Sequence, residues 1–72
     1  MINNYSFFSP GQDREYYVQR LTRNDLYYVV EDGGRRIEDR LKSGGHGTAE
    51  AAQRTLELMA AEYGWERGMQ RR

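Results

Sequence analysis

The stretch that decides the fold is residues 15–41, EYYVQRLTRNDLYYVVEDGGRRIEDRL. β-Branched and aromatic residues dominate residues 15–21 and 26–32, and turn-forming residues bound both segments. Residues 35–41 follow a Gly-Gly pair and precede a glycine-rich loop. We therefore predict three short antiparallel strands, at 15–21, 26–32 and 35–41.

A two-residue hairpin loop at the Gly-Gly pair would fix the register of the last two predicted strands. It would place Val30 opposite Ile37 and Tyr27 opposite Arg40, so that apolar and charged pairs fall on opposite faces. The Tyr27 ring would then hold the Arg40 guanidinium in place.

The same alternation assigns the two faces of the predicted sheet, provided that the loop between the first two strands has an odd length. The inner face holds Tyr16, Val18, Leu26, Tyr28, Val30, Ile37 and Leu41. The outer face carries Tyr17, Gln19, Leu21, Tyr27, Val29, Glu31, Arg36, Glu38 and Arg40.

A single helix is predicted over residues 48–63, with Thr48 as its N-cap. Apolar residues repeat at helical spacing, and we expect Leu56 and Met59 to be among the most buried side chains. Three strands followed by one helix define an α+β fold of the β-β-β-α type, in which the helix packs on one face of a three-stranded antiparallel sheet.

The ends of the predicted domain follow from glycine and proline signals. Gly64 is expected to end the helix in the left-handed conformation, and Trp65 can fold back onto the last turn. Residues 1–13 are expected to form an irregular N-terminal segment and residues 66–72 a frayed basic tail. The domain itself would span residues 14–65.

The composition excludes several classes of protein. The chain has 72 residues, 11 basic and 11 acidic, with one histidine and no cysteine. Disulfide scaffolds, cysteine zinc fingers and thiol catalysis are therefore excluded, and zero net charge disfavours a general polyanion binder. We expect no membrane span and no signal peptide, because the apolar runs are only a few residues long. Ten arginines and nine aromatic residues are instead typical of a recognition surface.

No candidate catalytic or metal site has a convincing residue pattern. His46 is the only histidine and lies in a glycine-rich loop, which is a poor platform for catalytic geometry. Glu38 and Asp39 are adjacent on a predicted strand and would point to opposite faces. We therefore expect a protein without enzymatic activity, cofactor or metal ion.

The predicted outer face is the candidate partner-binding site, because Tyr and Arg concentrate binding energy in interfaces. A second copy of the chain could pair through this face, or the N-terminal segment could cover it through Phe7 and Phe8. The residues predicted to bind a partner are Tyr17, Gln19, Tyr27, Val29, Arg36 and Arg40.

Residues 26–65 resemble small phage-encoded inhibitors of the anti-CRISPR type. The resemblance lies in the Glu31-Asp32-Gly33 turn, the glycine-rich loop and the alanine-rich helix that ends in an aromatic residue. It implies a non-catalytic protein that sterically blocks a surface of a larger protein or nucleoprotein complex in the cytoplasm of a bacterial host.

A second resemblance gives an alternative function. The β-β-β-α outline is similar to the DNA-binding domains of plant ethylene-response proteins and to the arm-binding domains of tyrosine recombinases. It implies a regulator whose sheet lies in the major groove, with Tyr17, Tyr27, Arg36 and Arg40 reading bases. Acidic residues on the same predicted face disfavour phosphate contacts, and DNA binding would weaken steeply with salt.

Overall fold

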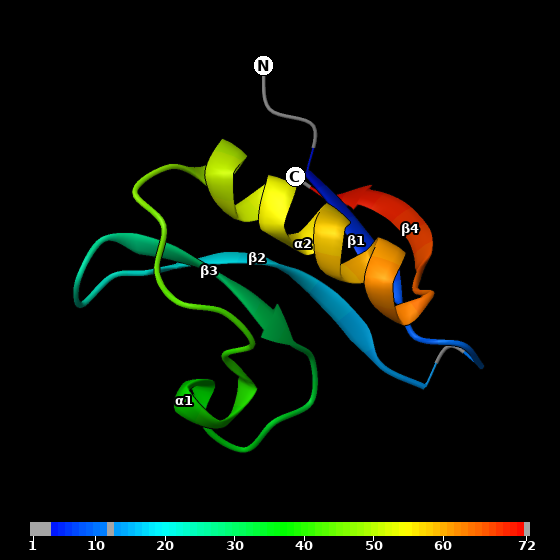
Figure 1. Ribbon diagram of the computed structural model, residues 1–72. Helices are drawn as coiled ribbons and strands as arrows, with labels where there is room; N and C mark the ends of the chain where they lie inside the picture. Colours follow the sequence, from blue (N-terminus) through cyan, green and yellow to red (C-terminus); the bar gives the residue numbers. More distant parts are fainter. Residues whose placement is uncertain (1–3, 12, 72) are drawn as a thin grey trace.

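Four strands form one antiparallel sheet in the order β3-β2-β1-β4, and a long helix covers one of its faces (Figure 1). The computed structural model describes residues 4–11 and 13–71. Its elements in chain order are β1 (Asn4–Phe8), β2 (Glu15–Leu21), β3 (Leu26–Glu31), α1 (Ile37–Arg40), α2 (Ala49–Tyr63) and β4 (Glu66–Arg71). The predicted α+β class, with an antiparallel sheet and a helix, is confirmed, but the sheet has four strands.

The helix α2 has both of its predicted caps. The Thr48 side chain accepts a hydrogen bond from the Ala51 N–H at 3.1 Å, which satisfies one of the free donors of the first turn. Gly64 ends the helix with φ of 75°, a left-handed conformation that glycine adopts without a Cβ clash.

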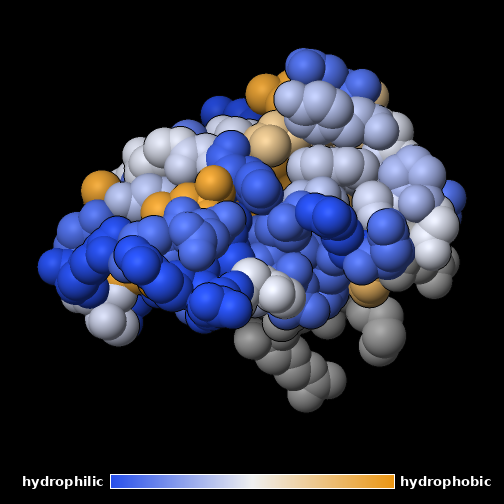
Figure 2. Space-filling model, turned by 90° about the horizontal axis from the view of Figure 1, so that it is seen from below, coloured by the Kyte–Doolittle hydropathy of each residue, from blue (hydrophilic) through white to orange (hydrophobic). Residues whose placement is uncertain are grey.

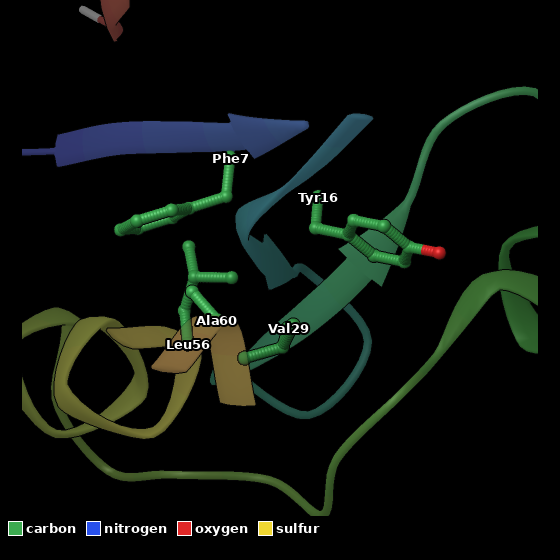
Figure 3. Packing of buried hydrophobic residues seen from close by; sticks show 5 residues of the cluster. All are labelled: Phe7, Tyr16, Val29, Leu56 and Ala60. Carbon is green, nitrogen blue, oxygen red and sulfur yellow. The ribbon is translucent and has the colours of Figure 1, made fainter. Parts of the chain in front are cut away.

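The core lies between α2 and the sheet, as Figure 3 shows. Phe7 from β1 and Leu56 from α2 point toward one another, and Val29 from β3 lies beside them. Leu56 and Val29 are fully buried, which confirms the prediction for Leu56. Met59 is only partly buried and packs against this cluster.

The turn between β2 and β3 reverses the predicted phase of β3. Leu21 lies opposite Leu26, so the connection has four residues and not an odd number. Asp25 adopts the left-handed conformation with φ of 61° and donates its N–H to the Leu21 carbonyl at 2.8 Å. Val29 therefore faces α2 and Val30 faces away, and the predicted assignment of β3 residues to the two faces is wrong.

The predicted third strand is also wrong, because the single turn of α1 occupies its centre. Glu38 lies in the first turn and Arg40 in the last, where the helix dipole favours those charges, and Arg23 pairs with Glu38 at 2.6 Å. The chain reaches the edge of β3 only afterwards, with Leu41 rather than Ile37 opposite Val30. The four residues of α1 account for this shift of four positions.

The segment after α1 covers the outer edge and part of the distal face of β3, the face turned away from α2. Tyr27 and His46 exchange two backbone hydrogen bonds of 2.8 Å, and the Lys42 N–H donates to the Val29 carbonyl at 2.7 Å. A Cβ atom at Gly45 would lie only 2.7 Å from Leu26 Cδ1, so glycine allows the close approach. Seen from the side of α1, the surface is mostly hydrophilic with small hydrophobic spots (Figure 2).

Both ends of the chain add strands that were not predicted. Residues 4–8 form β1 rather than an irregular segment, and residues 66–71 form β4 rather than a frayed tail. The strand β1 lies between β2 and β4, and the Arg67 guanidinium lies 4.4 Å from the centroid of the Tyr5 ring. Residues 1–3, 12 and 72 lie outside the described part of the chain. Within that part, no helix has the length and apolar character needed to cross a membrane.

Candidate binding site

A pocket of about 380 Å³ opens at the end of the sheet where β2 begins and β3 ends, near the C-terminus of α2. Pockets of this volume are large enough for one or two side chains or a small ligand. Aromatic and thioether groups form most of its wall, and two charged side chains complete it. We call it the Trp65 pocket; its lining residues are Tyr16, Glu31, Lys42, Met59, Tyr63 and Trp65.

Trp65 reaches the pocket because Gly64 turns the chain sharply after α2. The backbone N–H of Trp65 donates to the Ala60 carbonyl at 2.9 Å. This hydrogen bond is typical of the residue that follows a glycine in the left-handed conformation at a helix C-terminus. This places the indole flat on the Tyr16 ring, with centroids 3.7 Å apart and an angle of 4° between the planes. Tyr63 lies on the same indole at 5.4 Å and 30°. The sequence predicted the folding back of Trp65 but not its contact with β2.

A polar network surrounds Glu31 at the edge of the pocket. The Tyr16 hydroxyl donates to Glu31 Oε2 at 2.8 Å, and Figure 3 shows this hydroxyl pointing away from the core. Arg14 Nη1 lies 3.2 Å from both carboxylate oxygens, and Lys42 Nζ lies 3.7 Å from Oε1. Tyr16 and Glu31 are cross-strand neighbours, so the pairing of β2 with β3 brings these groups together.

The network shifts the pKa of both of its acidic members. Burial, together with the hydrogen bond to the ionised Glu31, raises the pKa of Tyr16 to about 12. Burial alone would raise the pKa of Glu31, but hydrogen bonds from Tyr16 and Arg14 and the charge of Lys42 lower it below its ordinary value. At neutral pH the pocket therefore holds a neutral phenol beside an ionised carboxylate.

The six residues predicted to bind a partner do not form one surface. Val29 is fully buried in the core and cannot contact a partner in the folded protein, so its placement on an exposed face is wrong. Tyr27 lies on the α2 side of β3, whereas Tyr17 and Gln19 lie on the distal side of β2. Arg36 immediately precedes α1 and Arg40 ends it, so neither is on a strand.

One pair of these residues does meet. Arg40 Nη1 donates to the Tyr17 hydroxyl at 3.3 Å, so α1 is attached to the distal side of β2. The predicted contact between Arg40 and Tyr27 is wrong, because Tyr27 lies opposite Arg20 and forms a bridge to His46. Phe7 does not cover the outer face either, since it belongs to the core under α2.

Ser43 and His46 have side chains that occur in catalytic sites, but here both residues attach the loop that follows α1 to β3. The Ser43 hydroxyl accepts from the Val29 N–H at 3.0 Å and donates to the Gly44 carbonyl at 2.9 Å. His46 is fixed to β3 through its backbone and does not line the Trp65 pocket. Within residues 4–11 and 13–71, no group of three or more His, Asp or Glu side chains is arranged to hold a metal ion.

Comparison of the chain with protein-family models, curated proteins and solved structures finds no match. The candidate site is therefore defined by its geometry. Sequence reasoning missed it, although a single tryptophan directly after a helix-ending glycine was a usable signal, because such a residue packs back on whatever lies beside the helix end.

Proposed function

We propose that this chain is a non-catalytic binding protein that sterically occupies a surface of a larger protein or nucleoprotein complex, with the Trp65 pocket receiving an anchor side chain. The observation that supports this proposal is the pocket of about 380 Å³, lined by Tyr16 from β2 and by Tyr63 and Trp65 from the end of α2. Interfaces concentrate their binding energy in such anchor-and-pocket contacts.

The exposure of the lining residues fits a docking role. Tyr63 is 56% exposed, and the only other large hydrophobic side chain so exposed in the described chain is Leu58, at 67%. Tyr16 is 8% exposed and, with Trp65, forms a rigid floor beneath the opening. A preformed aromatic floor lowers the ordering cost of binding.

The polar side chains of Ser43 and Glu31 are already bonded to other groups of the protein, which favours binding over catalysis. Ser43 is held by backbone groups, and Glu31 is held by Tyr16, Arg14 and Lys42. A catalytic base needs access to a substrate proton, and a carboxylate with these partners is a poor base. Inhibition of the anti-CRISPR type needs only such a binding surface, and that assignment stays a prediction from the sequence.

The alternative of major-groove DNA recognition has less support. A sheet that enters the groove needs an open face with basic and aromatic readers on it. Here α2 covers one face, α1 is bonded to Tyr17 on the other, and Tyr27 lies on the opposite side from Tyr17. The residues predicted to read bases therefore do not lie on one common surface.

Affinity capture from host cells tests the proposal. The tagged chain should retain a protein partner after nuclease treatment and at about 0.5 M salt, because an aromatic interface is weakly screened whereas phosphate contacts are lost. The variant Tyr63→Ala should lose that partner. Retention by nucleic acid alone, or equal capture by Tyr63→Ala, would contradict the proposal.

A further inference from the structure

The carboxylate of Glu31, the anionic acceptor of the Trp65 pocket, already accepts three hydrogen bonds. Glu31 Oε2 accepts from the Tyr16 hydroxyl at 2.8 Å, and Arg14 Nη1 lies 3.2 Å from each carboxylate oxygen. A carboxylate has about four acceptor positions in total. A cationic ligand would therefore compete with Arg14, and also with the ammonium of Lys42, for the same group.

Lys42 is the cationic donor in the pocket lining, and Glu31 does not use its hydrogen-bonding capacity. Its Nζ atom lies 3.7 Å from Glu31 Oε1, which is an ion pair but too long for a hydrogen bond. The side chain is 35% exposed, whereas that of Glu31 is 15% exposed. An ammonium group has three donors, so Lys42 can turn toward a ligand while Arg14 continues to neutralise Glu31.

The rest of the wall is apolar or aromatic, from Met59, Tyr63 and Trp65. Within the cluster of Arg14, Lys42 and Glu31, the charges sum to one positive charge. We infer that the ligand of the pocket carries a carboxylate joined to an aromatic or aliphatic group; this inference rests on the proposed function. In a protein partner this group is either a hydrophobic C-terminal residue with its free carboxylate or an acidic side chain beside a hydrophobic anchor.

Trp65 is the only tryptophan in the sequence, so its fluorescence reports directly on the pocket. The full chain is titrated with three probes of matched shape: 3-phenylpropionate, 3-phenylpropanamide and 3-phenylpropylammonium. The carboxylate should bind at least about fivefold more tightly than the amide at low salt, as expected for one partly exposed charge-assisted contact, and the ammonium should bind most weakly.

Two variants separate the role of Lys42 from general charge effects. Lys42→Gln should bind the carboxylate and the amide equally, with a melting temperature within a few degrees of the parent, because a partly exposed ion pair contributes little to stability. Arg54→Gln removes a cation from the exposed face of α2, outside the pocket, and should keep the preference. An amide or ammonium that binds the parent as tightly as the carboxylate would overturn this inference but leave the pocket as a binding site. No response to any probe would remove both the inference and the proposed function.

Two acetylated peptides distinguish the sources of the carboxylate. A peptide that ends in a free C-terminal phenylalanine tests the terminal carboxylate, and an amidated Glu-Phe peptide tests the side chain. An amidated peptide without glutamate is the common control. Tighter binding of one test peptide than of the control identifies the source, and equal binding of all three overturns the inference for protein partners.

Discussion

The indole of Trp65 lies flat on the phenol ring of Tyr16, with centroids 3.7 Å apart and planes 4° from parallel. This stack joins Trp65, the second residue after α2, to the first half of β2, almost fifty positions earlier in the chain. Tyr16 also belongs to the core cluster with Phe7 and Leu56. The contact therefore links the floor of the pocket to the packing of the whole domain.

Removing the indole should destabilise the fold. We expect Trp65→Ala to lower the free energy of unfolding by about 2–4 kcal/mol, somewhat less than for a fully buried tryptophan, because Trp65 is only partly buried. Urea denaturation followed by circular dichroism measures the change. Leu58→Ala, at a side chain 67% exposed, should stay within about 0.5 kcal/mol of the parent. A Trp65→Ala variant as stable as Leu58→Ala would show that the stack does not hold the domain together.

A side chain at the C-terminal end of α2 should lower the stability of the fold through backbone strain alone. Gly64 has φ of 75° and open space around the position of a Cβ atom. Gly64→Ala should therefore cost about 1 kcal/mol through left-handed strain. Gly44 is also open but has no positive φ, and Gly44→Ala should cost less than about 0.5 kcal/mol. Equal costs in thermal denaturation would contradict this assignment of Gly64.

The Tyr16–Glu31 hydrogen bond should give stability a distinct pH profile. The pKa of Tyr16 rises from 10.0 to about 12 on folding, so its contribution is complete below pH 10 and is lost as pH rises through 12. The pKa of Glu31 falls below 4.5, so its contribution is present above that pH and is lost as pH falls through the lower folded value. Stability should thus decline at both extremes.

The variants Tyr16→Phe and Tyr63→Phe test this profile in urea denaturation across the pH range. Tyr16→Phe keeps the ring but removes the hydroxyl, so it should abolish most of the alkaline decline between about pH 10 and 12. It should also weaken the acid decline, because Glu31 loses a donor. Tyr63→Phe changes an exposed tyrosine and should retain both declines. An alkaline decline of parental size in Tyr16→Phe would assign it to another group.

The sequence predicted the elements that local patterns define. The strand at 15–21 is confirmed to the residue, the next strand ends one residue earlier than predicted, and α2 has the predicted caps. These segments have their own β propensity, helical spacing or capping residues. The phase of β3 was not predictable in this way, because Val29 and Val30 are both apolar and both fully buried, on opposite faces.

The errors concern contacts between distant parts of the chain. The sequence of β4, ERGMQR, has little β propensity, and it becomes a strand because β1 offers it a paired edge. The pocket likewise needs Tyr16, Lys42 and Trp65 to meet from separate elements. No spacing rule predicts such a meeting, since it depends on the strand order and on the αL turn at Gly64.

The most direct test of the account compares the two most exposed large hydrophobic residues of the described chain, Tyr63 and Leu58, in binding to the captured partner. Both lie on α2, but only Tyr63 lines the Trp65 pocket. Calorimetric titration should show that Tyr63→Ala weakens binding by about 2 kcal/mol, or roughly thirtyfold, while Leu58→Ala stays within about twofold of the parent. Equal dissociation constants for the two variants, or a larger loss for Leu58→Ala, would contradict the assignment of the Trp65 pocket as the recognition site.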